Sequence, residues 1–226
     1  MACLAATPVA IMSDTLRITE IFHSLQGETR TAGLPTVFVR LTGCPLRCQY
    51  CDSAYAFSGG TLFTLDSIME QVASMRPRYV CVTGGEPLAQ PNAILLLKRL
   101  CDAGYEVSLE TSGALDIGAT DTRVSRIVDL KTPGSRESHR NLYDNVGLLT
   151  RNDQVKFVIC SREDYDWAVS KVIEYNLLER AGEVLFSPSH HDVKASDLAD
   201  WIVADNLPVR FQLQLHKLLW NDEPGR

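Results

Sequence analysis

The chain has 226 residues, of which 45% are hydrophobic and 22% charged, and its net charge is −6. This is the composition of a soluble globular protein that is long enough to bury one full core. A negative chain lacks the basic patch typical of nucleic-acid binding, and no apolar run approaches the roughly 20 residues that span a bilayer. We therefore expect neither a nucleic acid nor a membrane as partner.

The N-terminal residues are mildly apolar but carry no basic segment, so they make a poor signal peptide. We expect residues 1–15 to be a disordered leader, with Met1 or Met12 as the true start, and residues 16–226 to form a single domain. The seven cysteines are an odd number without disulfide-scaffold spacing. That pattern indicates a protein of the reducing cytoplasm.

Apolar runs alternate with amphipathic stretches almost to the end of the chain. The apolar runs predict strands over 17–23, 36–42, 78–83, 105–110, 126–130, 153–159, 183–187 and 209–215. The amphipathic stretches predict helices over 64–75, 91–103, 162–179 and 194–206. This alternation predicts an α/β fold with a parallel sheet and helices outside it. Because the units are too few for a closed eight-fold barrel, we expect a partial, open βα barrel.

One connection is unusually long. Residues 132–152 are polar at first and carry enough apolar side chains in their second half for a short helix. A segment of this length between strands is expected to be a lid or a mobile loop. In open sheets of this kind ligands bind at the carboxyl ends of the strands, so the chemistry is expected in motifs that follow strands.

Cys44, Cys48 and Cys51 form a CxxxCxxC motif directly after a predicted strand, with no fourth cysteine nearby. A closed structural zinc site or a fully ligated cubane cluster takes four protein ligands. Three thiolates on a four-iron cubane leave one iron without a protein ligand, so the motif is a candidate reaction centre. A zinc site with a distant fourth ligand and a chance cluster of buried thiols are the alternatives.

Other strand ends carry residues suited to binding. Gly84 and Gly85 allow the backbone to approach a ligand closely, and Glu86 could hold an ammonium group. Arg40, in an otherwise apolar run, could clamp a carboxylate with a bidentate fork. Tyr50, just before the last motif cysteine, could stack on an adenine ring.

The CxxxCxxC motif with an aromatic residue before its last cysteine resembles the signature of the radical S-adenosylmethionine (SAM) superfamily. The SLQGE segment at 24–28, residues 33–44, Cys51-Asp52-Ser53 and the DLKTPGS segment at 129–135 resemble the 7-carboxy-7-deazaguanine synthase family within it. The resemblance extends from about residue 16 to 220. That family converts 6-carboxy-5,6,7,8-tetrahydropterin to 7-carboxy-7-deazaguanine with loss of ammonia, in queuosine and 7-deazapurine biosynthesis.

The resemblance implies the cofactors and the site residues. Cys44, Cys48 and Cys51 would hold a [4Fe-4S] cluster whose open iron chelates SAM. The expected SAM contacts are Tyr50, Gly84, Gly85, Glu86, Glu110, Thr111, Asp129, Leu130, Lys131, Ser187 and Pro188. The expected substrate contacts are Leu25, Gln26, Gly27, Glu28, Arg40, Thr83 and His216. Ser187-Pro188 departs from the Gln-Pro form of the family, and the C-terminal tail also departs from its pattern.

The resemblance also implies a metal ion and partners. Ser53 matches a Mg²⁺-binding hydroxyl position that is commonly Thr, and Mg²⁺ prefers oxygen ligands. A flavodoxin or ferredoxin would supply electrons, and the chain would form a homodimer. Two other functions remain open: a glycyl-radical activating enzyme, against which the SLQGE segment and Arg40 argue, and a non-catalytic iron–sulfur or zinc module.

Overall fold

The computed structural model describes residues 14–190, 192–221, 223 and 225. The predicted leader lies almost wholly outside these residues, and the first strand already begins at Thr15. Within the described part, every helix is too short or too polar to span a bilayer.

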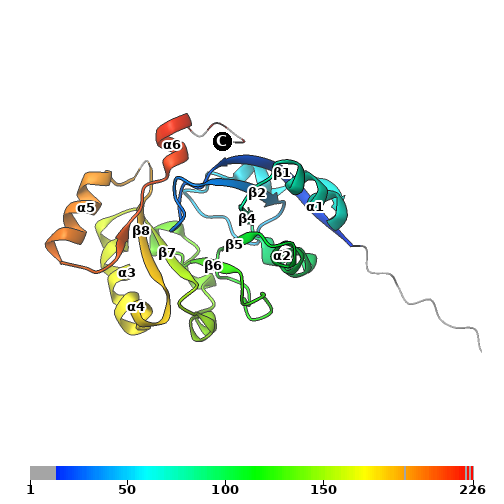
Figure 1. Cartoon of the computed structure of the whole chain (residues 1–226). Coiled ribbons are helices and arrows are strands. Elements are labelled where there is room, and N and C mark those ends of the chain that lie inside the picture. Colours follow the sequence, from blue (N-terminus) through cyan, green and yellow to red (C-terminus); the bar gives the residue numbers. More distant parts are fainter. Residues whose placement is uncertain (1–13, 191, 222, 224, 226) are drawn as a thin grey trace, which may run out of the picture.

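The described strands form one sheet in the order β3-β1-β2-β4-β5-β6-β7-β8-β9. Neighbours from β2 to β9 pair in parallel, whereas β1 pairs antiparallel with both β2 and β3. The strands are β1 (Thr15–Leu25), β2 (Pro35–Leu41), β3 (Thr61–Thr64), β4 (Tyr79–Gly84), β5 (Glu106–Thr111), β6 (Ser125–Asp129), β7 (Gln154–Ile159), β8 (Glu183–Pro188) and β9 (Arg210–Phe211). The sheet is curved and open, which confirms the predicted partial barrel (Figure 1).

Helices cover the outer side of the sheet (Figure 1). They are α1 (Leu65–Ser74), α2 (Asn92–Asp102), α3 (Arg162–Glu174), α4 (Leu177–Arg180) and α5 (Ala195–Ala204). The last helix, α6 (Leu215–Trp220), instead lies against the β1–β2 connection, where Leu215 N donates to Gly27 O at 3.3 Å. The Thr64 side chain caps α1 and the Ser161 side chain caps α3, as expected for residues that accept from orphan N–H groups. One apolar core packs α1 and α2 on β1, β2, β4 and β5, and a second packs α3, α4 and α5 on β6, β7 and β8.

Three predicted elements differ from the structure. The helix predicted over 162–179 is split into α3 and α4 at Asn176, which adopts a left-handed conformation with φ 51°. The strand predicted over 209–215 shrinks to β9, and α6 follows it. β1 and β2 are antiparallel because residues 26–34 fold back as a hairpin loop, in which Gln26 N donates to Leu34 O at 2.9 Å. Parallel strands would need a crossover of about a dozen residues or more.

The segment 132–152 consists of short 3₁₀ turns, η3 (Pro133–Ser135), η4 (Ser138–Arg140) and η5 (Tyr143–Leu148), so a short helix in its second half is confirmed. It is packed rather than loose. The Asn145 side chain donates to Gly113 O at 3.1 Å and to Leu115 O at 2.8 Å. The segment is therefore fixed to the turn after β5.

Candidate active site

A cavity opens where the parallel strands end, and most of the predicted site residues line it. These are Leu25, Gln26, Gly27, Glu28, Arg40, Cys44, Cys48, Tyr50, Cys51, Ser53, Thr83, Gly84, Gly85, Glu110, Thr111, Asp129, Lys131 and His216. The predicted residues Glu86, Leu130, Ser187 and Pro188 do not line it. Residues more than 190 positions apart in the chain thus share one wall, as expected for the carboxyl ends of a parallel sheet.

The three motif cysteines lie on one irregular loop after β2. Gly43 starts the loop with φ 99°, a conformation that favours glycine. The loop then turns back on itself, with Cys51 N donating to Cys48 O at 3.2 Å. All three thiols are half-buried, and burial raises the pKa of each of them, that of Cys48 to about 11. Without a metal the thiols are therefore protonated at neutral pH, and a cluster would displace their protons.

The glycine turn after β4 packs directly on the cysteine loop. Glu86 N donates to Gly43 O at 2.8 Å, and Gly85 N donates to Leu41 O at 3.1 Å. A Cβ atom on Gly85 would lie 2.2 Å from Gly43 O and 2.8 Å from Cys44 Cβ. Only glycine permits this approach, so the Gly-Gly turn places the cysteine loop as well as lining the cavity.

The Glu86 carboxylate does not face the cavity. It is fully buried and accepts hydrogen bonds from Leu88 N at 3.0 Å, Ser112 N at 2.7 Å and Thr111 Oγ1 at 2.9 Å. With its oxygens occupied in this way, Glu86 braces the turn after β5. The ammonium contact expected of Glu86 stays a prediction.

Three further predicted residues belong to the packing instead of the cavity wall. Leu130 is in the second apolar core, and Ser187 and Pro188 are buried at the end of β8. Ser189 and His190, which come next in the chain, line the cavity in their place. The SAM contacts expected at Ser187 and Pro188 stay predictions, and Ser189 and His190 are the cavity-lining residues at the same end of β8.

A buried polar group with unused hydrogen-bonding atoms lies beside the cysteine loop. Lys131 Nζ contacts Asp129 Oδ2 at 2.9 Å and lies 5.8 Å from the centre of the Tyr50 ring. Asp129 Oδ1 and Tyr50 Oη are buried, and neither has a hydrogen-bond partner among the described residues. Burial would lower the pKa of Lys131, but Asp129 and Tyr50 raise it, so the ammonium stays charged. Unused buried polar atoms at a cavity wall fit a polar ligand.

Arg40 is held at the cavity by two acceptors and two rings. Its Nε donates to Glu20 Oε1 at 2.7 Å, and its Cζ lies 5.8 Å from the centre of each of the Phe22 and Tyr55 rings. Tyr55 Oη also donates to Glu20 Oε1, at 2.8 Å. Arg40 Nη1 reaches Ser53 Oγ at 3.5 Å. The guanidinium is thus fixed through Nε, which leaves the Nη edge to meet an anion.

Glu28 is the centre of a network on the facing loop. It forms an ion pair with Lys156 through Oε2, and Gln214 Nε2 donates to Oε1 at 2.9 Å. His216 Nδ1 lies 3.8 Å from the same Oε1. Burial alone would raise the pKa of Glu28. Lys156 and His216 outweigh burial and lower the pKa to about 2. Glu28 is therefore an anion across the physiological pH range.

The polar residues next to Glu28 extend the network into the barrel. Gln26 Oε1 accepts from Gly27 N at 2.8 Å, and Gln26 Nε2 donates to Glu110 Oε1 at 3.2 Å. Thr83 Oγ1 donates to the other oxygen of Glu110 at 3.0 Å. The predicted substrate residues are thus joined to one another across β4 and β5.

The Ser53 hydroxyl lies next to the Asp52 carboxylate. Its hydroxyl donates to Asp52 Oδ1 at 2.9 Å, and Lys217 Nζ lies 3.2 Å from Asp52 Oδ2. Side-chain ligand atoms of Glu28, Asp52 and His216 lie within 4.8 Å of one another. Because both carboxylates are already paired with lysines, this trio is less suited to a metal ion than the Ser53 hydroxyl with a bound ligand's own oxygens.

Comparison with known proteins identifies the family. Residues 38–175 match the model of the radical SAM superfamily. The chain is 40% identical to the 7-carboxy-7-deazaguanine synthase of Koribacter versatilis (strain Ellin345), a match that covers 92% of this chain and 98% of that protein. It is 42% identical to the protein of the same name from Chlorobaculum tepidum, over 92% of this chain and 96% of the relative. The chain belongs to the 7-carboxy-7-deazaguanine synthase family of radical SAM enzymes.

The fold agrees with this placement. The crystal structure of QueE from Escherichia coli superposes with a TM-score of 0.73 at 20% identity, covering 88% of this chain and 94% of that one. Radical SAM enzymes use a [4Fe-4S] cluster and SAM, and the loop that carries three cysteines fits such a cluster. Tyr50 and Asp129, whose polar atoms are unused, and the glycine turn line the same cavity as the cysteines, which fits SAM next to the cluster.

Several residues that line or brace this cavity had no individual role assigned to them in the sequence analysis. They are Glu20, Asp52, Tyr55, Lys156, Gln214 and Lys217. The sequence does indicate a role for Lys156, because a charged residue in the middle of the apolar run 153–159 is as unusual as Arg40 in its own apolar run. The sequence gives no such indication for Glu20, because Glu20 and Arg40 become neighbours only when β1 pairs with β2.

Proposed function

We propose that this chain converts 6-carboxy-5,6,7,8-tetrahydropterin to 7-carboxy-7-deazaguanine with loss of ammonia. The single observation that supports it most is the pairing of a fixed cation, Arg40, with a fixed anion, Glu28, in the cavity that the cysteine loop lines. A carboxylated pterin has a carboxylate at one end and a guanidine-like N–H edge at the other. Arg40 matches the carboxylate in charge, and Glu28 matches the N–H edge as a hydrogen-bond acceptor.

The chain's own residues would bind and orient the substrate. When bound, the cluster and SAM supply a hydrogen-abstracting radical. Arg40 holds the carboxylate, and Glu28 accepts from the guanidine-like edge. The amide of Gln26 is fixed by backbone N–H groups and by Glu110, so it adds directional contacts to the pterin rim. These contacts set which carbon of the ring meets the radical.

Ser53 is proposed to hold Mg²⁺ together with the substrate carboxylate. Its hydroxyl lies beside Arg40 Nη1 and Asp52, so an ion there would reach the same carboxylate as Arg40. Mg²⁺ keeps several waters and needs few protein ligands, which makes a single hydroxyl sufficient.

The partners and location follow from the family and the cysteines. The described cysteines outside the motif are Cys81, Cys101 and Cys160, and none belongs to a second cluster motif. An external flavodoxin or ferredoxin is therefore proposed as reductant. A homodimer is proposed from the family resemblance. All described cysteines are free, which supports the cytoplasm as location.

The test is anaerobic incubation of reconstituted protein with SAM, dithionite, Mg²⁺ and the carboxylated pterin. Mass spectrometry should detect 7-carboxy-7-deazaguanine and released ammonia. Cleavage of SAM without any deazaguanine would reject this substrate while leaving the radical SAM assignment intact. A protein that cleaves SAM only in the presence of a glycyl-radical enzyme would be an activating enzyme instead.

A further inference from the structure

Lys156 lies in the middle of β7, and every residue of this strand is buried. Its side chain is only 11% exposed and reaches across the cavity to Glu28, which lies 128 positions earlier in the chain. Lysine is almost never buried to this degree unless it is paired, because an ammonium loses its hydration. An apolar residue would serve β7 packing better, so the lysine needs another explanation.

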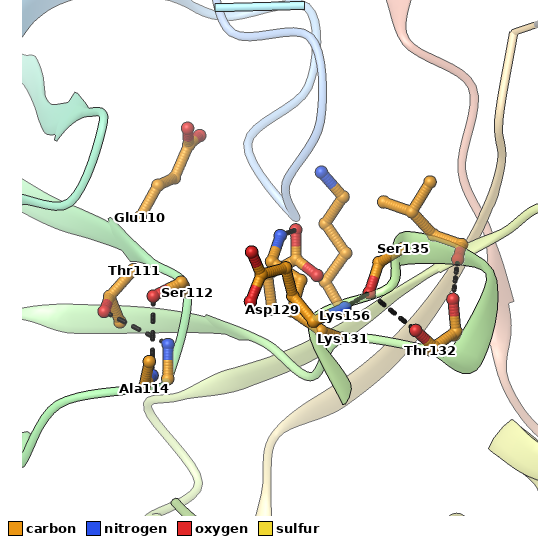
Figure 2. A network of polar contacts seen from close by, with 12 residues as sticks. Glu110, Thr111, Ser112, Ala114, Asp129, Lys131, Thr132, Ser135 and Lys156 are labelled. Atoms are coloured by element: carbon orange, nitrogen blue, oxygen red, sulfur yellow. Dashed lines mark hydrogen bonds and ion pairs between the residues drawn. The ribbon is translucent and has the colours of Figure 1, made fainter. Parts of the chain in front are cut away.

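The charges around Lys156 come from three neighbouring elements. Glu28 faces it from the β1–β2 hairpin, while Asp129 on β6 and Glu110 on β5 also raise its pKa against the lowering effect of burial. Figure 2 shows Lys156 beside Asp129 and Lys131 at the strand ends. Asp129 is already paired with Lys131, and Glu110 accepts from Thr83 and Gln26. Glu28 is thus the direct partner of Lys156.

The two oxygens of Glu28 are held differently. Lys156 occupies Oε2, and Gln214 Nε2 occupies Oε1 at 2.9 Å. A carboxylate oxygen offers two lone-pair sites, so one acceptor site remains on each oxygen. A carboxylate that presents both of these sites on the same side suits a pair of parallel N–H donors.

We propose that Lys156 is a positioning residue that fixes the Glu28 carboxylate so that its remaining acceptor edge meets the guanidine-like end of the pterin. This inference rests on the proposed function. Lys156 acts through Glu28 and does not contact the substrate itself. Without it, Glu28 would keep only its contacts at Oε1, with the Gln214 amide and His216, and the carboxylate would be free to rotate away from the position that the ammonium fixes.

The test compares Lys156→Met, which keeps the side-chain length without the charge, with Lys156→Arg, which keeps the charge. We expect the methionine variant to raise the KM for pterin by about tenfold while kcat falls by less than about threefold, because uniform binding is lost. The arginine variant should stay within about threefold of wild type. Lys98→Met, at an exposed position, is the matched control.

A second readout does not depend on turnover. The dissociation constant of the oxidised 6-carboxypterin, measured by fluorescence quenching on the reconstituted protein, should rise by about tenfold in Lys156→Met. SAM cleavage in the absence of pterin should be unchanged. A role in folding alone would lower the melting temperature and kcat without this selective loss of pterin affinity. Where Lys156→Met fails to fold, Lys156→Gln takes its place in the comparison.

A double-mutant cycle with Glu28→Gln decides whether Lys156 acts through Glu28. In the Glu28→Gln background, adding Lys156→Met should change the KM by less than about twofold, because the group that it positions is already altered. A full tenfold effect in that background, or an unchanged KM in the single variant, would overturn the inference. If wild-type protein makes no deazaguanine from the pterin, it is the proposed function that fails.

Discussion

Glu86 accepts a hydrogen bond from the backbone N–H of Ser112 at 2.7 Å and a second one from Ser112 Oγ at 2.5 Å. The same carboxylate accepts from Thr111 Oγ1 and from Leu88 N. It is fully buried between the ends of β4 and β5. The acidic residue of the glycine turn is therefore a brace that joins two loops of the cavity wall.

Replacing Glu86 should destabilise the whole protein. Glu86→Ala leaves several buried donors without an acceptor, and we expect it to lower the free energy of unfolding by about 3 kcal/mol. Urea unfolding of the metal-free protein measures this directly. Glu70→Ala, at an exposed position of α1, is the control and should stay within about 0.5 kcal/mol of wild type. A loss below about 1 kcal/mol for Glu86→Ala would contradict the bracing role.

The contact between Gly85 and Gly43 predicts a sharp steric effect. In Gly85→Ala the new methyl group would lie 2.2 Å from Gly43 O, so the cysteine loop must move. We expect the reconstituted variant to bind well under half the iron and sulfide of wild type, about a tenth in the severe case. In Gly147→Ala, where no atom lies within 4 Å of the added Cβ, iron content should be normal. Equal iron in both variants would show that the loop tolerates displacement.

Replacing one cysteine of the motif should abolish the absorbance of the cluster. Cys48→Ala removes one of three thiolates, so the brown absorbance of the cluster and all turnover should disappear after anaerobic reconstitution. Cys101→Ala, which removes a buried thiol on α2, should keep both. Turnover retained by the Cys48 variant would contradict the assignment of the cluster to this loop.

Replacing Arg40 should weaken substrate binding. Arg40→Ala should raise the KM for pterin by about a hundredfold, because a buried charge-assisted contact to a carboxylate is lost. Arg40→Lys should recover little of it, since an ammonium cannot reproduce the fork that Glu20 orients. Steady-state kinetics at saturating SAM measure both values. Arg78→Ala, on the surface, should leave the KM for pterin unchanged. An unchanged KM for Arg40→Ala would refute the carboxylate clamp.

Much of this architecture is readable in the sequence because its signals are local. Strand–helix alternation predicted the parallel sheet, and the CxxxCxxC spacing located the cysteine loop. The direction of the Glu86 side chain was not readable. It depends on the backbone of Gly84, whose φ of 153° favours glycine, and on the donors Thr111 and Ser112 at the end of β5 and just after it, which only the folded sheet brings near.

The C-terminal segment shows a second limit. Its apolar pattern predicted a strand to residue 215, but β9 lies at the sheet edge and pairs only with β8. The chain instead turns back over the cavity, where Gln212 Nε2 donates to Gly27 O at 3.2 Å and Leu215 N donates to the same oxygen at 3.3 Å. His216 thereby reaches Glu28 from the start of α6. The contact between His216 and Glu28 could not be predicted from the sequence, because the two residues are far apart in the chain and no local pattern links them.

A buried ion pair joins β6 to the residue that precedes β7. Arg126 Nη2 lies 2.6 Å from Asp153 Oδ2, and Arg126 Nε donates to Oδ1 at 2.9 Å. Thr150 adds donors from N and Oγ1 to Oδ2. Burial raises the pKa of Asp153, but the bonds from Arg126 and Thr150 outweigh it, so the net pKa is lowered.

This lowered pKa fixes the sign of a pH effect. The stabilisation by Asp153 is complete above the pKa of an unfolded aspartate, about 3.9, and is lost as the pH falls below it through the folded value. Asp153→Asn should therefore lower the free energy of unfolding by about 3 kcal/mol at pH 7 and flatten its decline between about pH 5 and 3. Urea unfolding across this range measures both, with Asp144→Asn as the exposed control. If the slope of the Asp153 variant matched wild type, other carboxylates would control acid unfolding.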